Sequence, residues 1–329
     1  MPAIPISILD LAHIGNGGSA ADSFRASVAI AQLAERSGFR RVWYAEHHNM
    51  STIASSATSV LIAHVAAHTK TIRLGAGGVM LPNHSPLVIA EQFGTLETLH
   101  PGRIDLGLGR APGSDQNTMR ALRRDGMSAE SFPRDVLELQ GYLTGRSMIP
   151  GVDAVPGKDT HVPLYILGSS LFGAKLAAAL GLPYAFASHF APQALTDAVA
   201  TYRREFQPSD QLAHPWVIAG VNVVAADTTR EAQALMRESQ RLRVSQLLGG
   251  GHPLDDADAD AILDSPSGQQ IRQMSHYSAI GTPGEVRAYL DQFVVHAAAD
   301  ELIVASMARN TEATLRSFEL LAEVAELNG

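Results

Sequence analysis

Three consecutive residues of this 329-residue sequence, Glu46, His47 and His48, have side chains that suit acid–base chemistry. A histidine pKa lies close to neutral pH, so a histidine in a pocket serves as acid, base or hydrogen-bond donor. Neighbouring residues of extended backbone point to opposite sides, and no third ligand stands at a defined spacing. The sequence therefore predicts a reactive histidine and no metal site; the alternative is one packed and one exposed histidine.

Two further positions indicate contact with a flat, negatively charged ligand. Gly77 and Gly78 are adjacent, and glycine lets the backbone approach a planar group closely, although a tight turn would also use such a pair. Arg110 ends the apolar run 104–109, which indicates an anion site or, alternatively, a surface ion pair.

Gly168, Ser169 and Ser170 stand between an apolar run and an amphipathic segment. The N–H groups at a helix N-terminus bind phosphate, and serine hydroxyls add to such a site. Serine is also the ordinary N-cap of a helix, and both roles are compatible. Together with Arg110, this segment predicts a phosphate site.

The elements that must position these residues alternate along the whole chain. Apolar runs predict strands at 4–10, 41–45, 72–76, 104–109, 164–167, 184–187, 216–225 and 301–305. Amphipathic segments predict helices at 19–38, 56–68, 86–99, 131–143, 169–180, 192–206, 229–244, 283–296 and 311–327. Residues 145–163 are expected to form a surface loop or small hairpin, and 249–278 a long loop of the kind that often forms a lid.

Strands that are each followed by a helix favour a closed (β/α)8 TIM barrel, with the whole of residues 1–329 as one domain. Reactive groups of such barrels lie at the C-terminal ends of the strands. The histidines follow the second predicted strand, the glycine pair the third, Arg110 the fourth and Gly168 the fifth. They are therefore predicted to meet at one mouth of the barrel.

Composition excludes several classes of function. The net charge of −8 disfavours nucleic acid and anionic membrane surfaces as partners, and the absence of cysteine excludes disulfides and a thiol nucleophile. No basic leader precedes the first predicted strand, and no apolar run approaches the ~18 residues that a membrane span needs. A cytoplasmic protein without a membrane partner is predicted.

The reactive residues, taken with their neighbours, resemble the bacterial luciferase-like flavin monooxygenase family. The similarity extends over nearly the whole chain, and the order and spacing of its motifs are specific. The motifs are Glu46-His47-His48, Gly75-Ala76-Gly77-Gly78 with Leu81-Pro82, Ala90-Glu91, Gly102-Arg103, Gly107-Leu108-Gly109-Arg110, and Gly281-Thr282-Pro283 with Glu285.

The resemblance implies a barrel with insertions that binds FMN as FMNH2, supplied by a separate reductase, and uses O2 to form a flavin hydroperoxide that oxidises a small organic substrate. His47 matches the family's active-site histidine, and His48, Asn49 or His189 is expected to assist it. Gly77 and Gly78 match a non-prolyl cis peptide against the flavin ring, and Arg110 and Ser169 match phosphate contacts. Gly168, Phe172 and Gly109 replace a glutamate, a threonine and a cysteine of luciferase, which argues against light emission.

The family also implies a homodimer through the helices that follow the second and third strands. Their small or apolar residues are Ala57, Val60, Leu61, His64, Leu87, Ile89, Ala90 and Phe93. Alternatives are an F420-dependent oxidoreductase, which is less favoured, and a non-catalytic flavin-binding or partner protein. A flavin-independent hydrolase or lyase is a further alternative, but the sequence contains no motif of such an enzyme.

Overall fold

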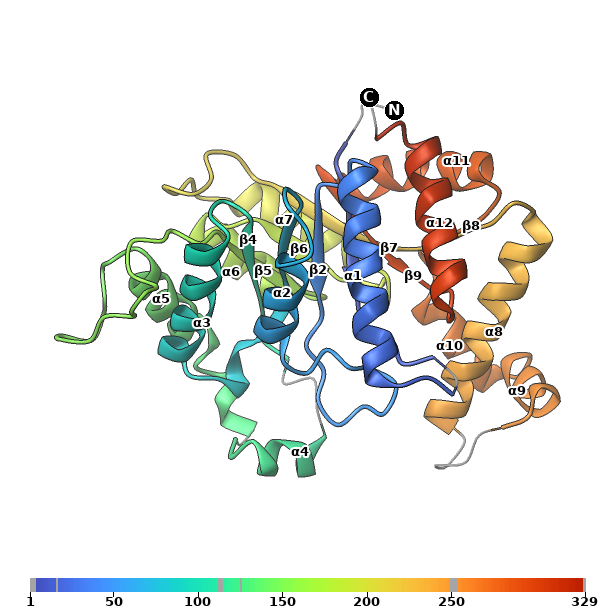
Figure 1. Cartoon of the computed structure of the whole chain (residues 1–329), viewed down its shortest axis with the longest axis horizontal. Coiled ribbons are helices and arrows are strands. Elements are labelled where there is room, and N and C mark those ends of the chain that lie inside the picture. Colours follow the sequence, from blue (N-terminus) through green and yellow to red (C-terminus); the bar gives the residue numbers. More distant parts are fainter. Residues whose placement is uncertain (1–3, 16, 112–114, 125, 249–253, 328–329) are drawn as a thin grey trace.

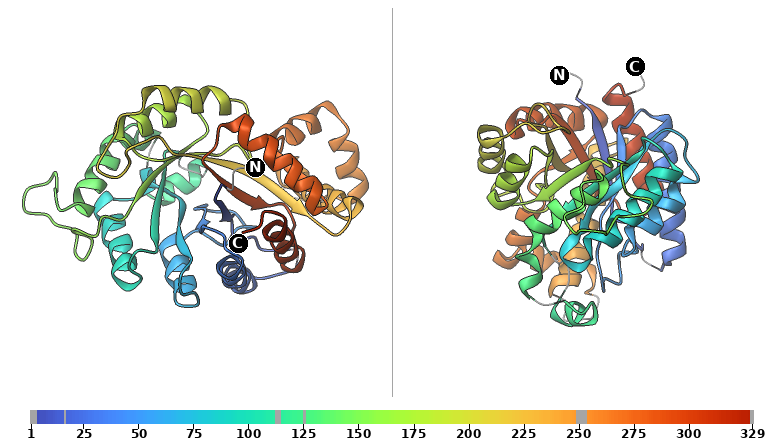
Figure 2. Two further views of the ribbon diagram at one scale, coloured as in Figure 1. Left: turned by 90° about the horizontal axis from the view of Figure 1, so that it is seen from above. Right: turned by 90° about the vertical axis from the view of Figure 1, so that its left-hand side faces the viewer.

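The computed structural model describes residues 4–15, 17–111, 115–124, 126–248 and 254–327. Eight parallel strands form a closed barrel with helices around it, which confirms the predicted (β/α)8 fold (Figures 1 and 2). Around the barrel the order is β1, β2, β3, β4, β5, β6, β7, β9 and back to β1. These strands are β1 (Ile6–Asp10), β2 (Arg41–Tyr44), β3 (Arg73–Met80), β4 (Ile104–Gly109), β5 (Leu164–Gly168), β6 (Tyr184–Phe186), β7 (Val217–Ala225) and β9 (Glu301–Ser306).

The helices predicted from the amphipathic segments are all present. They are α1 (Ala20–Arg36), α2 (Thr58–Ala66), α3 (Pro86–Leu99), α5 (Phe132–Leu143), α6 (Leu171–Leu180), α7 (Leu195–Glu205), α8 (Thr229–Leu248), α11 (Pro283–Ala297) and α12 (Thr311–Val324). A short helix α4 (Gln116–Ala121) and the 3-10 turns η1 (Leu81–Asn83) and η2 (Gly126–Ala129) lie in connections. None of the helices in the described ranges is long and apolar enough to cross a membrane.

Local sequence fixes the ends of several of these helices. Ser19 and Asp22 form a capping box at the start of α1, and Thr282 forms one with Glu285 at the start of α11. Gly181, in a left-handed conformation with φ of 63°, ends α6 before β6 begins. These residues fix where the helices that connect consecutive strands begin and end.

The prediction of a long loop at 249–278 is wrong for the part of it that the structure describes. Helices α9 (Asp256–Leu263) and α10 (Pro266–Met274) form there, followed by the strand β8 (Ser278–Gly281). Asp255 and Ser265 cap the two helices, and the small apolar cluster of Val244, Ala259, Leu263 and Ile271 packs them on α8. Only a few apolar side chains form this cluster, so the sequence of α9 and α10 shows no clear helical spacing of apolar residues.

Strand β8 lies outside the eight-stranded barrel and pairs with the second half of β7. The first half of β7 pairs with β6, from Val217 to Ala219, and the second half pairs with β8, from Asn222 to Ala225. The seam between β6 and β7 therefore opens toward the C-terminal ends of the strands. Helices α8, α9 and α10 gather beside this end of the barrel (Figure 1).

A buried cluster of charged side chains fills the barrel interior near the N-terminal ends of the strands. The guanidinium of Arg41, only 1% exposed, contacts Asp105 at 2.7 Å and Glu301 at 2.9 Å. Arg73 forms a second ion pair with Asp105. The indole N–H of Trp43 donates to the same Asp105 carboxylate at 3.1 Å. The cluster thus fixes the orientation of the Trp43 ring, which faces the cavity described next.

Candidate active site

A cavity of about 660 Å³ opens at the C-terminal ends of the barrel strands. Its wall contains most of the residues that the sequence singles out for chemistry: Glu46, His47, Gly77, Gly78, Arg110, Gly168, Ser169 and Ser170. These residues come from the ends of β2, β3, β4 and β5. The prediction that they lie together at one mouth of the barrel is therefore confirmed. His48 and Asn49 are not among the residues that line the cavity.

Successive side chains of extended backbone point to opposite sides, which explains why His47 and His48, after the end of β2, have different surroundings. His47 faces the cavity, and its buried Nδ1 has no hydrogen-bond partner among the described residues. Burial lowers the pKa of His47, the Glu46 carboxylate partly offsets this, and His48 lowers it further. The imidazole of His47 is therefore neutral at neutral pH and can exchange a proton or hydrogen bond with a bound molecule.

His189 stands in the same cavity wall with a similar environment. Its buried Nδ1 also lacks a hydrogen-bond partner within the described ranges. Burial, followed by the charges of Arg243 and His47, lowers the pKa of His189 to about 4. Two neutral imidazoles with free nitrogen atoms therefore face one cavity.

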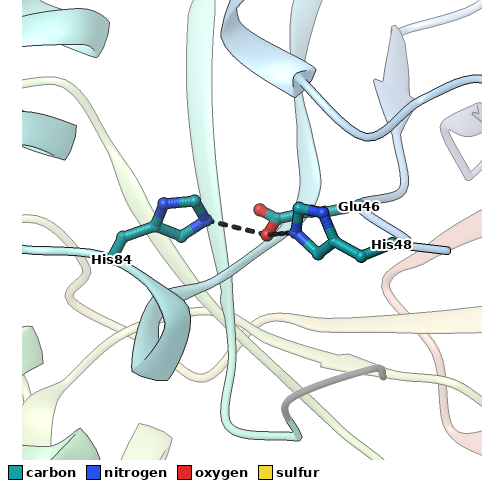
Figure 3. A group of neighbouring side chains, drawn as sticks. All are labelled: Glu46, His48 and His84. Atoms are coloured by element: carbon teal, nitrogen blue, oxygen red, sulfur yellow. Dashed lines mark hydrogen bonds and ion pairs between the residues drawn. The ribbon is translucent and has the colours of Figure 1, made fainter. Parts of the chain in front are cut away.

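Glu46, which also lines the cavity, forms a cluster with His48 and His84, shown in Figure 3. The Nε2 atoms of His48 and His84 lie 2.8 and 2.7 Å from the same carboxylate oxygen of Glu46. The other carboxylate oxygen accepts the backbone N–H of Met80 at 3.1 Å. Glu46, which is 1% exposed, thus ties the end of β2 to the end of β3 and to the segment that follows η1.

The cluster bears on the prediction that the chain has no metal site. That argument depended on the lack of a third ligand at a regular spacing, whereas the fold brings His84 to within 4.8 Å of the other two ligand atoms. A carboxylate with two imidazoles is a donor set that divalent transition metals accept. The separations of 2.7 and 2.8 Å are also those of imidazole N–H groups that donate to a carboxylate. We interpret the cluster as hydrogen-bonded and as a support for the cavity wall.

The glycine pair lies within β3 itself and not in a turn after it. The peptide bond between Gly77 and Gly78 is cis, as the family resemblance implies, and the register with β4 shifts at this place. A Cβ atom at Gly78 would lie 2.7 Å from the carbonyl oxygen of Gly107, and one at Gly77 would lie 2.8 Å from the Cβ of Trp43. Only glycine fits both positions, so this part of the cavity wall is bare backbone against which a planar group can lie.

Arg110 and the first residues of α6 lie close together at another part of the wall. The Arg110 guanidinium stacks 4.2 Å above the ring of Phe172, and its Nε donates to the carbonyl of Ala129 at 3.3 Å. Ser170 is the N-cap of α6, but its side chain makes no capping hydrogen bond. Phe172, which departs from the luciferase pattern, therefore orients the arginine beside a helix N-terminus that can receive an anion.

Three basic residues of the cavity wall were not assigned to the site from the sequence. His13 follows β1, Arg309 follows β9 and Arg243 lies on α8, yet all three line the cavity. The rule that reactive groups follow barrel strands could have found His13 and Arg309. No local pattern marks Arg243, because a helix brings it to the mouth from outside the barrel.

Comparison with known proteins identifies the family. The sequence profile described as luciferase-like monooxygenase matches residues 4–301. The chain belongs to the luciferase-like monooxygenase family. It is 50% identical over 328 residues to the luciferase-like monooxygenase of Escherichia coli strain K12, with 98% of this chain and 97% of that protein covered.

Two further proteins are similar to this chain in sequence or structure. The N-acetyl-S-alkylcysteine monooxygenase of Bacillus subtilis strain 168 is 37% identical over 254 residues, which cover 73% of each chain. The crystal structure of apo-MsnO8 has a TM-score of 0.89 and 35% identity, and the match covers 98% of this chain and 99% of that one.

Two solved structures of the same fold hold different cofactors. One solved structure of the same fold, a type II Baeyer-Villiger monooxygenase with a TM-score of 0.71 and 17% identity, contains FMN. Another, an F420-dependent secondary alcohol dehydrogenase with a TM-score of 0.70 and 14% identity, contains an F420–acetone adduct. At these identities the likeness concerns the fold alone.

The cavity of this chain fits such a cofactor by its shape and its donors. The bare backbone of Gly77 and Gly78 suits a tricyclic ring, and Arg110 with the start of α6 suits a phosphate. The unpartnered Nδ1 of His47 needs a hydrogen-bonding atom from a bound molecule or water.

Proposed function

We propose that the chain is the oxygenase component of a two-component monooxygenase, which uses FMNH2 and O2 to oxidise a small organic substrate. The observation that supports this most is that one cavity joins the neutral His47, the bare backbone of Gly77 and Gly78, and the anion-binding Arg110. A flavin-independent hydrolase or lyase would leave the bare glycine wall without a planar ring to support.

Each part of the cavity has a distinct role in this proposal. The guanidinium of Arg110 and the N-terminus of α6, with Ser169 and Ser170, hold the flavin phosphate. The backbone of Gly77 and Gly78 supports the ring, whose reduced form supplies the two electrons for oxygen activation. One oxygen atom of O2 enters the substrate and the other leaves as water. His47 holds or transfers a proton at its free ring nitrogen, and the apolar walls exclude water.

His48 acts as a positioning residue in this scheme. Its imidazole contacts Glu46 and does not reach the cavity wall, so it affects the reaction through the segment that Glu46 holds. FMNH2 comes from a separate flavin reductase, since the sequence offers no convincing nicotinamide-binding motif.

The first experiment is an anaerobic titration of the protein with FMNH2 and, in parallel, with reduced F420. We expect FMNH2 to bind at least tenfold more tightly, and mixing with O2 and substrate to give oxygenated product. Thioethers head the substrate screen, because one relative is named for an S-alkylcysteine derivative. A preference for F420 would assign the chain to hydride transfer, and binding without product for any substrate would favour a flavin carrier. Binding of neither cofactor would refute the proposal.

Replacement of His47 by alanine tests the assigned proton role. We expect an unchanged affinity for FMNH2 and a fall in product formation of about 100-fold, the range that general acid–base groups contribute. Reoxidation of the flavin should then release H2O2 in place of product. His214→Ala removes an exposed histidine outside the cavity and should leave both quantities unchanged. Equal product yields in wild type and His47→Ala would rule out the role.

A homodimer through α2 and α3 is also part of the proposal, with a correction to its residues. Leu61, Ile89, Ala90 and Phe93, which the sequence assigned to the outer apolar face, are buried in the chain's own core. The exposed apolar side chains of these helices are Val60 and Val88, at 68% and 43% exposure, with Leu99 at 62%. Light scattering at micromolar concentration should give the mass of a dimer, and Val60→Asp should give that of a monomer.

A further inference from the structure

The cavity has a second positively charged region, which the flavin scheme above does not use. Arg243 of α8 and Arg309, three residues after the end of β9, both line it, and His13 stands between the ends of β1 and α1. Among the described residues, Arg243 makes no hydrogen bond or ion pair. Within the described ranges, the hydrogen bonds of the Arg309 guanidinium go to neutral groups, the Ser239 hydroxyl at 3.0 Å and the His13 ring at 3.3 Å.

No carboxylate neutralises this region within the described part of the chain. Neither arginine forms an ion pair there, and Glu238, which acts on Arg309 through space, lies beyond ion-pair distance. Burial and then the charge of Arg243 lower the pKa of Arg309 to about 10. Burial and then Arg309 lower the pKa of His13 to about 3, with smaller contributions from Arg243 and His47. Among the described residues, the two guanidiniums therefore have no ion-pair partner, which a partly buried pair of arginines normally has, and only the more distant Glu238 offsets the charge of Arg309.

The barrel topology separates this region from Arg110. Arg110 follows β4 and Arg309 follows β9, and these strands stand four places apart in the closed ring of eight. They therefore lie on opposite sides of the mouth. FMN carries one phosphate, so a flavin held at Arg110 leaves the second region for another anion.

We infer that Arg243 and Arg309 form a subsite for an anionic group, a carboxylate or a sulfonate, of the organic substrate. Two guanidinium groups can each present parallel N–H donors to such an oxyanion. Apolar side chains that line the same cavity, among them Leu11, Met50, Ile53 and Phe190, suit an alkyl chain attached to such an anion. That the anion belongs to the substrate rests on the proposed function. That the two arginines bind an anion does not.

The test compares three probes of equal chain length: octanoate, octanesulfonate and the neutral octanamide. Calorimetric titration into the FMNH2-loaded protein under anaerobic conditions should show at least a tenfold preference for one anion over octanamide. Arg243→Met should reduce this preference below twofold and leave the affinity for octanamide unchanged. Arg243→Lys should restore part of it, because the charge remains while the planar fork is lost.

Arg243 is the informative position, because its substitution removes no contact that the described structure records. Arg309→Met should act in the same direction, with its fold checked by circular dichroism. Arg230→Met removes an exposed arginine from the same helix and should leave the preference unchanged. A preference that is absent in the wild type, or that persists in Arg243→Met, would overturn the inference.

The affinity for FMNH2 separates this inference from the proposed function. We expect Arg110→Met to weaken FMNH2 binding at least tenfold and Arg243→Met to leave it unchanged. The reverse result would make Arg243 the phosphate site and overturn the inference. If the wild type binds no FMNH2, the proposed function fails, and the same three probes titrated into the flavin-free protein still decide whether the anion subsite exists.

Discussion

Replacement of Glu46 by glutamine would test whether the cluster in Figure 3 holds the cavity wall together. Burial by itself would raise the pKa of the Glu46 carboxyl. The hydrogen bonds from His48 and His84, the charge of His84 and the Met80 N–H together lower it to about 2, from an ordinary value of 4.5. Because Glu46 is 1% exposed, solvent does not screen these interactions appreciably.

The lowered pKa of Glu46 gives the size of the expected loss of stability. At about 1.4 kcal/mol per pKa unit, the ionised carboxylate contributes about 3 kcal/mol to the free energy of unfolding at neutral pH. Since the pKa is lower in the folded state, this contribution is complete above pH 4.5 and is lost as the pH falls toward 2. Glutamine keeps the size of the side chain but cannot ionise, so Glu46→Gln should lose about 3 kcal/mol at pH 7.

Urea unfolding followed by far-UV circular dichroism measures this loss. Glu130→Gln removes an exposed carboxylate and should change the free energy of unfolding by less than about 0.5 kcal/mol. The hydrogen bond from His48 to Glu46 raises the pKa of His48, against the effect of its burial, so NMR titration should find that pKa lower in Glu46→Gln. A loss below about 1 kcal/mol at pH 7 would refute the argument. Stabilisation of the wild type alone by added Zn²⁺ would identify a metal site instead.

Two other substitutions test the cavity wall at Gly78 and the buried charged cluster around Arg41. Gly78→Ala would place a Cβ atom 2.7 Å from the carbonyl oxygen of Gly107; it should cost about 1–3 kcal/mol of stability by thermal unfolding and weaken FMNH2 binding. A variant of unchanged stability would show that the strand can relax. Arg41→Met would remove the buried arginine that contacts Glu301 and leave it with the half-exposed Arg40 at 3.7 Å, while Asp105 keeps Arg73. It should cost about 3 kcal/mol in urea unfolding, the lower end for a broken buried ion pair, and a loss below about 1 kcal/mol would contradict this.

The sequence itself determined the barrel and one side of its mouth. Alternation of apolar runs with amphipathic segments is local, and each run buries its own side chains, so all eight barrel strands were predictable. The rule that reactive groups follow barrel strands then brought His47, Arg110 and Ser169 to one cavity. Even the opposite directions of His47 and His48 follow from the two-residue period of extended backbone.

The tertiary structure alone decided the rest, since the rest depends on residues far apart in the chain. His84 meets Glu46 across 38 positions, and Glu301 meets Arg41 across 260, so no spacing in the sequence indicates either contact. Helices α9 and α10 form where few apolar residues pack against α8, which is too weak a pattern to read without the partner surface. Arg243 reaches the cavity because α8 packs beside β7 and β8, and only the packing of that helix sets the direction of its side chain.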